Sequence, residues 1–154
     1  AARPISPGSA SRVGGLLRRE LHDRDAVDLD VLALQREGQH DVRVELLLAV
    51  LRKHCNLPVD TMDVFVNIAG GMRLSDPAID LGVCLSVYSS LKNIPLANTV
   101  GIAEVGLLGE LRAVTGLNKR IREAEKLGFK KILTAASYKS LRDVLESLNK
   151  TQKS

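Results

Sequence analysis

The chain of 154 residues is long enough for one domain with a full hydrophobic core, and 45% of its residues are hydrophobic although only 3% are aromatic. Because Trp is absent and aromatic rings are scarce, the composition argues against a base-stacking platform for single-stranded nucleic acid. The formal net charge of +4 suits an acidic partner such as nucleic acid but is also common in ordinary domains.

The sequence shows no sign of a membrane protein, a secreted protein or a metal site. No apolar run approaches the roughly 20 residues of a transmembrane helix, and the N-terminus lacks the apolar centre of a signal peptide. Cys55 and Cys84 lie in apolar helical patterns without the spacing of metal ligands, which predicts buried free thiols in a reducing compartment. We therefore expect a soluble intracellular chain without a membrane, metal or cofactor partner.

The N-terminal part divides into a polar stretch and the start of a folded domain. Residues 1–27 are rich in Ala, Ser, Gly, Pro and Arg, which predicts a linker or flexible tail ahead of a domain over 28–150. A strand is expected over 28–35. Apolar residues at helical spacing then predict an amphipathic helix over 41–56, with Arg43 on its polar side.

The middle of the chain predicts a strand followed by a buried helix. The segment Val64-Phe65-Val66-Asn67-Ile68 is rich in β-branched residues and precedes Gly70-Gly71, as is typical of a strand. Ser75-Asp76-Pro77 then supplies a cap and a proline at the first helical position, so we expect a helix that continues to Leu91. Because this helix is apolar on most faces, it should be central.

The C-terminal half alternates strands and helices without strict βαβ regularity. Strands are expected over 99–105 and 110–114, joined as a hairpin by the tight turn 106–109. The remaining elements are a helix over 118–127 closed by Gly128, a short strand over 130–133 and a final helix over 137–148. The pattern predicts an α+β (mixed α/β) domain.

Three short motifs follow one another in a distinctive order. They are Asp76-Pro77-Ala78-Ile79-Asp80, Gly109-Glu110-Leu111 and Thr115-Gly116-Leu117-Asn118-Lys119. With them, the run from Asp63 to Leu133 resembles the C-terminal Lon-protease-like domain of the RadA (Sms) family of DNA repair and recombination proteins. The resemblance implies a Lon-protease-like fold, also described as ribosomal protein S5 domain 2-like, in which a mixed sheet packs with helices.

The resemblance to Lon-type Ser/Lys peptidases does not extend to the catalytic residues. Ala78 falls where the serine nucleophile would lie, and Asn118 falls where the lysine base would lie. A methyl group cannot attack a carbonyl carbon, and a carboxamide has no basic nitrogen to accept the proton. We therefore expect no enzyme activity, and the ATPase core that precedes this domain in the RadA family is not in the sequence.

Basic residues gather around the third motif and the helix that follows it. The resemblance implies that such residues bind double-stranded DNA through phosphate contacts, while the domain helps to hold a homo-oligomeric, hexameric ring together. It also implies a cytoplasmic, nucleoid-associated protein, or an organellar one in a eukaryote. The candidate DNA-binding residues are Arg112, Lys119, Arg120, Arg122, Lys126, Lys130 and Lys131. The same residues could equally form the solvated face of an ordinary helix, with Glu123 and Glu125 interleaved.

Other interpretations stay open at three points. The chain could be an active peptidase whose nucleophile is Ser75, Ser86 or Ser89 and whose base is Lys119. It could instead be a pure oligomerisation scaffold that never contacts DNA. Glu104 and Glu110 flank the hairpin turn and could bind a metal ion, although unliganded carboxylates on surface hairpins are far commoner.

Overall fold

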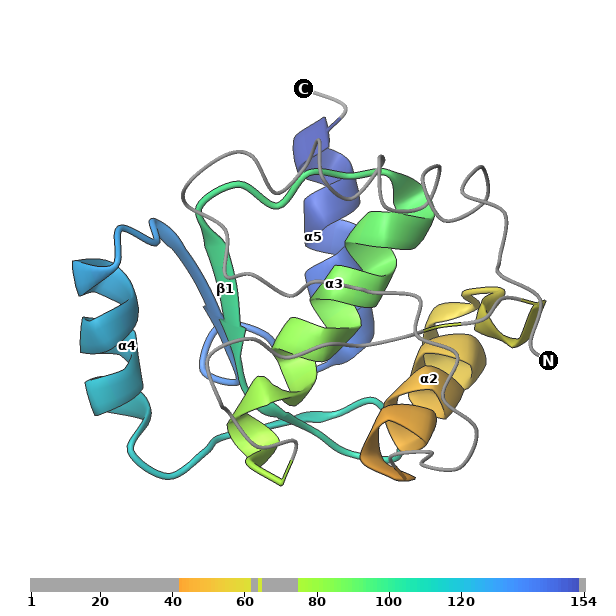
Figure 1. The fold of residues 1–154 in the computed structure, drawn as a ribbon, viewed down its shortest axis with the longest axis horizontal. Coiled ribbons are helices and arrows are strands. Elements are labelled where there is room, and N and C mark those ends of the chain that lie inside the picture. Colours follow the sequence, from red (N-terminus) through yellow and green to blue (C-terminus); the bar gives the residue numbers. More distant parts are fainter. Residues whose placement is uncertain (1–41, 62–63, 65–74, 153–154) are drawn as a thin grey trace, which may run out of the picture.

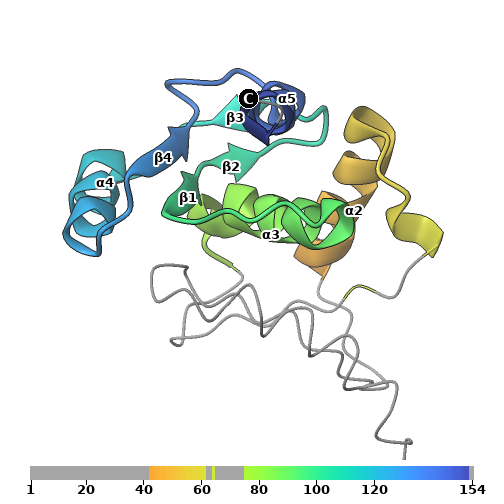
Figure 2. The same cartoon turned by 90° about the horizontal axis from the view of Figure 1, so that it is seen from above.

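The computed structural model describes residues 42–61, 64 and 75–152 (Figures 1 and 2). The tail expected over 1–27, the strand expected over 28–35 and most of the strand expected over 64–68 lie outside the described residues. Within the described part of the chain, no helix is long and apolar enough to cross a membrane.

The first helix of the described part, α2 (Val42–Cys55), follows the predicted helical spacing. Asn56, with a φ of 53°, adopts the left-handed conformation that ends the helix. A short 3-10 turn, η1 (Val59–Thr61), comes next. The buried face of α2 consists of Leu47, Val50 and Leu51.

The predicted central helix is confirmed, although its first turn is tighter than an α-helix. A 3-10 turn, η2 (Pro77–Ile79), continues directly into α3 (Asp80–Lys92). The side chain of Asp76 caps this start, because its Oδ1 accepts a hydrogen bond from the backbone N–H of Ala78 at 3.0 Å. Pro77 occupies the first position, where the missing N–H has no intrahelical partner to lose.

Four short strands in the described part of the chain form two separate pairs. The strands β1 (Thr99–Ile102) and β4 (Lys131–Thr134) are parallel, with Thr99 opposite Lys131. The strands β2 (Glu104–Val105) and β3 (Leu111–Arg112) are antiparallel, which confirms the predicted hairpin.

The expectation of one continuous strand over 99–105 is wrong, because the chain leaves the first pair at Ala103. Backbone groups on both sides of this break form hydrogen bonds with the N-terminus of α3. The carbonyl of Ala103 accepts a hydrogen bond from the N–H of Leu81 at 3.2 Å. The N–H of Val105 donates to the Asp80 carboxylate at 3.1 Å. These groups are hydrogen-bonded to the start of α3 and are therefore not available for the inter-strand hydrogen bonds of one continuous strand.

The two C-terminal helices differ in how well their starts could be predicted. The helix α4 (Leu117–Lys126) begins within one residue of the expected position, and Gly128, with a φ of 92°, follows its end. The helix α5 (Leu141–Gln152) begins later than the expected Ser137. Ser140 and Asp143 cap each other reciprocally, with N···O distances of 3.1 and 3.2 Å, and this capping box fixes the start.

The helix α3 lies at the centre, and α4 and α2 lie on opposite flanks of it (Figures 1 and 2). The main hydrophobic core joins α2, α3 and α5 with the hairpin. A smaller cluster joins α4 to β1 and to the start of α3. Helices and a small mixed set of strands make up the fold, so the predicted α+β class is confirmed.

Candidate functional site

Ala78, which the resemblance to Lon-type peptidases places at the nucleophile position, is buried. Only 4% of its surface is exposed, and it belongs to the small hydrophobic cluster with Ile102, Ala124 and Phe129. The 3-10 geometry of η2 and the Asp76 cap hold its backbone. The methyl group therefore fills part of the contact between the start of α3, β1 and α4.

Asn118, which the same resemblance places at the position of the lysine base, lies in the first turn of α4 and is exposed. Gly116 precedes the helix in the left-handed conformation, with a φ of 70°, which glycine adopts without strain. Lys119, the base in the alternative peptidase assignment, is also exposed. Both side chains thus reach water rather than an apolar pocket.

An ion pair links the two motifs that contain these positions. Nη2 of Arg120 lies 2.9 Å from Oδ2 of Asp76, and Nε of Arg120 donates to the Thr115 carbonyl at 3.3 Å. The pKa of the Asp76 carboxyl is lowered from its ordinary value, first by the hydrogen bond from the N–H of Ala78 and further by Arg120. One carboxylate therefore caps η2 and also holds α4 beside it.

The structure brings most of the predicted DNA-binding residues to the α4 flank. Lys119, Arg122 and Lys126 follow one another at helical spacing on one face of α4, and all three are exposed. Lys126 also contacts Glu123 at 3.0 Å. The α4 face, as we call these three residues, is extended by the exposed Lys130 and by the half-buried Lys131 at the start of β4.

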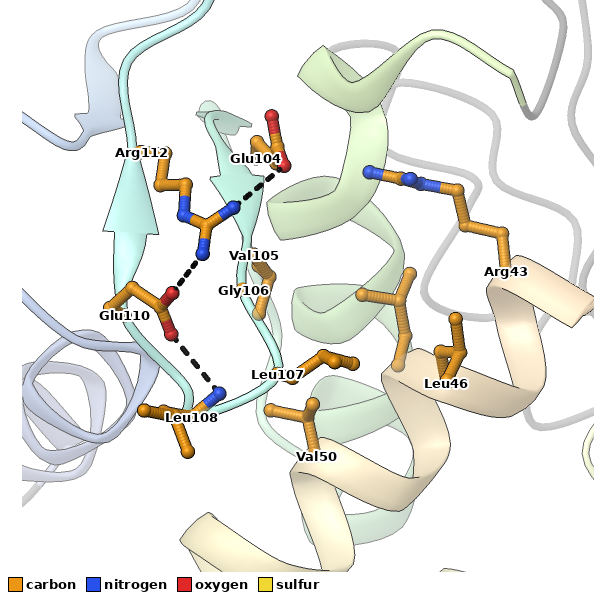
Figure 3. A pocket seen from close by; sticks show the side chains of 11 residues that line it. Arg43, Leu46, Val50, Glu104, Val105, Gly106, Leu107, Leu108, Glu110 and Arg112 are labelled. Carbon is orange, nitrogen blue, oxygen red and sulfur yellow. Dashed lines mark hydrogen bonds and ion pairs between the residues drawn. The ribbon is translucent and has the colours of Figure 1, made fainter.

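Arg112 is not part of that group, because it lies on β3 in the hairpin. Its guanidinium pairs with Glu104 at 3.5 Å and with the Glu110 carboxylate (Figure 3). The pKa of Glu110 is lowered by backbone hydrogen bonding and by Arg112. The two carboxylates considered as metal ligands thus bind an arginine, and no group of three metal-binding side chains occurs in the part of the chain that the structure describes.

Two serines of the alternative peptidase assignment use their hydroxyls within the fold. The hydroxyl of Ser86 donates to the Gly82 carbonyl at 3.0 Å, and the hydroxyl of Ser89 donates to the Ile94 carbonyl at 2.5 Å. Ser75 is exposed ahead of η2. Both bonded hydroxyls lie along α3, away from its start.

Asp80 is the polar residue whose role the sequence did not indicate. It is fully buried at the first position of α3, where Oδ1 accepts a hydrogen bond from Nε of Arg43 at 2.7 Å and Oδ2 accepts one from the N–H of Val105. Arg43 was expected on the polar side of α2, but it crosses to this carboxylate. The partners are 37 residues apart, so no local pattern could have paired them.

A groove of about 330 Å³ lies between α2 and the hairpin (Figure 3). Leu46, Leu47 and Val50 form its α2 wall, and Val105 to Leu108 form much of the opposite wall. The charged residues at its rim are Arg43, Glu104, Glu110 and Arg112. The walls are thus apolar and the rim is charged.

Both cysteines are free thiols, as predicted, and neither is poised to react as a thiolate. Burial raises the pKa of Cys55 to about 11, and burial raises the pKa of Cys84 well above its ordinary value. Cys84 is fully buried on α3, whereas Cys55 at the end of α2 is only half-buried.

Comparison with known proteins gives two kinds of match. A family model described as subunit ChlI of Mg-chelatase matches residues 28–137. "DNA repair protein RadA" of Halalkalibacterium halodurans is 46% identical over 92 residues, which is 59% of this chain and 20% of that protein. The RadA proteins of Mycobacterium tuberculosis and Streptococcus pyogenes are 42% and 45% identical over 60% and 58% of the chain, and 19% and 20% of their own lengths are covered. The chain thus spans about a fifth of the length of these relatives.

Proposed function

The chain belongs to the ChlI family, described as subunit ChlI of Mg-chelatase, and we propose that it serves a RadA-type DNA repair protein as a non-catalytic, Lon-like domain. In this role it binds double-stranded DNA through phosphates and contributes to a hexameric ring. The RadA relatives support the assignment to DNA repair, because the chain is 46% and 42% identical to two of them over 59% and 60% of its length. Such a domain works at the bacterial nucleoid, or in an organelle of a eukaryote.

The α4 face is the observation that carries the DNA-binding role. Its three cations lie side by side on one exposed helix surface, and Lys119 and Arg122 make no salt bridge with any described residue. Cations that are not committed to protein carboxylates can release the counterions of a phosphate backbone. Contacts of this kind position a protein on DNA but do not read its sequence.

The remaining basic residues take different parts in this proposal. Lys130 and Lys131 extend the α4 face, whereas Arg120 acts as a positioning residue because its guanidinium is held by Asp76. Arg112 lies on the hairpin with two carboxylates and is left out of the DNA surface. The refined surface is smaller than the seven residues that the sequence suggested.

The positions of Ala78 and Asn118 support the non-catalytic part. A nucleophile must reach its substrate, and a lysine base must be neutral, which requires an apolar environment. Here the first position is buried in a hydrophobic cluster and the second is exposed to water. The geometry therefore favours a domain that has a Lon-like fold but no peptidase activity.

Fluorescence anisotropy with a labelled DNA duplex tests the role of the α4 face. We expect the Lys119→Glu/Arg122→Glu variant to bind about tenfold more weakly or worse, because two attractive phosphate interactions become repulsive. The matched control is Lys92→Glu/Lys150→Glu, which changes the net charge equally at exposed residues of α3 and α5. The control should stay within about twofold of the wild type.

Two outcomes would count against this surface. If both double variants lose affinity equally, the duplex responds to net charge and not to the α4 face. If neither loses affinity, DNA is bound elsewhere or not at all, and the scaffold interpretation takes its place.

A further inference from the structure

Leu127, the residue that follows α4, presents a large apolar side chain to water. Its exposed fraction is 70%, and two exposed cations, Lys126 and Lys130, lie on either side of it in the chain. A single exposed leucine is ordinary on a protein surface. Two further observations set this one apart, namely the way in which α4 ends and the charges around the side chain.

The end of α4 is closed without any contribution from the Leu127 side chain. Gly128 turns the chain with a φ of 92°, and its N–H donates to the carbonyl of Glu125 at 3.0 Å. The N–H of Phe129 donates to the carbonyl of Ala124 at 3.1 Å. Phe129 and Ala124 also supply the hydrophobic contact that accompanies this type of closure, because both belong to one buried cluster. A polar side chain would therefore fit at position 127 without loss to the helix end.

The same closure holds the backbone that carries the leucine. The N–H of Leu127 donates to the carbonyls of Glu123 and Glu125, and its φ of −78° is still helical. Two residues later the chain is anchored again, because Phe129 is only 8% exposed. A side chain on an ordered backbone loses less conformational freedom on binding than one on a loose loop. Leu127 is therefore well placed to act as a rigid apolar contact.

The charges around Leu127 suit a polyanion. Lys126 belongs to the α4 face, and Lys130 extends that face beyond the helix end. Glu123, one turn before Leu127, pairs with Lys126 at 3.0 Å, so its charge is offset. Glu125 is two positions away and does not share this side of the helix. An apolar tip between cations matches a DNA duplex, in which two rows of phosphates border grooves lined by bases.

We propose that Leu127 enters the minor groove of a DNA duplex as an apolar wedge and partly unstacks one base step, while Lys126 and Lys130 bind the neighbouring phosphates. The inference rests on the proposed DNA-binding role of the α4 face and adds that the domain deforms the duplex. Leucine is one of the side chains that proteins insert between base steps in this way. Unstacking costs less where a duplex is already distorted, so the domain should prefer a mismatched duplex to a fully paired one without reading a sequence.

Fluorescence anisotropy of two duplexes of equal length and charge, one fully paired and one with a central mismatch, measures this preference. The wild type should bind the mismatched duplex about fivefold more tightly or better. Leu127→Ala should bind both duplexes alike and should keep the salt dependence of the wild type, because no cation is changed. With 2-aminopurine beside the mismatch, the wild type should raise the fluorescence of this base as it unstacks, and Leu127→Ala should not.

Two control variants make the test specific. Leu108→Ala removes the same side chain at a position that is 76% exposed, in the hairpin turn beside α2 and on the opposite flank from α4 (Figures 1 and 2). It should keep the preference for the mismatched duplex. Leu127→Met should also keep it, because methionine is another side chain that proteins use as a wedge. Positions 108 and 127 are exposed, so thermal unfolding should show that all three variants fold.

The wedge is overturned if the wild type binds both duplexes with equal affinity, if Leu127→Ala keeps the preference, or if the 2-aminopurine fluorescence does not rise. The DNA-binding role of the α4 face has its own readout in the Lys119→Glu/Arg122→Glu variant. If that variant loses affinity for the paired duplex while the wild type shows no preference, the wedge alone has failed. If the wild type binds neither duplex, both proposals are overturned.

Discussion

The Asp76 carboxylate accepts hydrogen bonds from two different elements of the structure. One oxygen caps η2 at the N–H of Ala78, and the other pairs with Arg120 of α4 at 2.9 Å. The side chains of both ion-pair partners are about one-third exposed, so the pair itself contributes modestly to stability. Its main effect is to fix the first turn of α4 beside the start of α3.

The free energy of unfolding should change with pH as the Asp76 carboxylate ionises. Because the folded-state pKa of Asp76 lies below its ordinary value of 3.8, the ionised group stabilises the folded chain at neutral pH. That contribution is lost as the pH falls below about 4 and through the folded-state pKa. Asp76→Asn should lower the free energy of unfolding by about 0.5 kcal/mol at pH 7. Urea titrations of this variant should also show a smaller loss of stability between neutral and acid pH.

The double variant Asp76→Asn/Arg120→Gln provides the control for that experiment. If the ion pair is the cause, the two substitutions should not add, because each alone removes the same interaction. Additive losses in free energy would mean that Arg120 stabilises α4 through other groups, such as the carbonyl of Thr115.

Introducing the residue types of a Lon-type dyad at the two expected positions should not produce peptidase activity. In Ala78→Ser/Asn118→Lys, the new hydroxyl would lie in a buried hydrophobic cluster and the new lysine would lie in water. An exposed lysine keeps a high pKa and is protonated at neutral pH, so it cannot accept the serine proton. Casein digestion by the double variant above the wild-type background would contradict this account of the site.

Asp80 should matter more for stability than any exposed carboxylate. Asp80→Ala removes the buried partner of Arg43 and leaves the N–H of Val105 without its acceptor, so we expect a loss of about 3 kcal/mol in the free energy of unfolding. The matched control is Asp60→Ala, an exposed carboxylate in η1, with a change of about 0.5 kcal/mol or less. Urea denaturation of the two variants compares them directly, and similar losses would refute the structural role of Asp80.

At the residue scale, local chemistry was predictable and distant pairing was not. The cap and proline at Asp76 and Pro77 predicted where the central helix starts, because capping acts within one turn. Arg43 gave no such signal, since its partner is 37 residues away and an arginine on an amphipathic helix normally faces water.

At the scale of elements, the packing of α3 against β1 depends on glycine. A Cβ on Gly101 of β1 would lie 2.7 Å from Cγ of Leu81 and 2.8 Å from Cδ1 of Leu85, which are both buried in the core. A Cβ on Gly82 of α3 would meet only the Gly101 carbonyl oxygen, at an ordinary 3.7 Å. The helix and strand therefore approach closely because one specific position lacks a side chain.

These two glycines give a matched pair of variants. Gly101→Ala should destabilise the chain by about 2 kcal/mol, because the side chains that it would strike are packed. Gly82→Ala should be neutral or stabilise by up to about 1 kcal/mol, since alanine favours helix and the space is open. Thermal and urea unfolding of both variants would show the contrast, and equal effects would mean that α3 and β1 do not pack as described.

The elements themselves were predictable where their own residues determine them. Strong apolar spacing predicted α2 and α3, and the glycine-rich turn predicted the hairpin. The break at Ala103 was not predictable, because it depends on hydrogen bonds from the start of α3. The late start of α5 could have been anticipated, since Ser140 and Asp143 have the spacing of a capping box.

At the scale of the whole molecule, the described part has exposed cations on α4 and an apolar groove at α2. The helices α4 and α2 lie on opposite flanks of α3 (Figure 2). This arrangement separates the α4 face, which we propose binds DNA, from the groove between α2 and the hairpin. The sequence indicated the basic residues, because charge is visible in composition. It could not indicate that Arg112 lies in the hairpin with two carboxylates and apart from the other basic residues, because that relation exists only after folding.

The salt dependence of duplex affinity tests the central claim most directly. We would compare the wild type with Lys119→Gln/Arg122→Gln/Lys126→Gln, which neutralises the α4 face without adding repulsion. Affinity of the wild type should fall steeply with salt, and the slope of log K against log salt should be shallower in the variant by about 0.9 for each phosphate that the variant no longer neutralises. An unchanged slope, or an affinity that follows base sequence and not salt, would contradict a phosphate-binding domain at this surface.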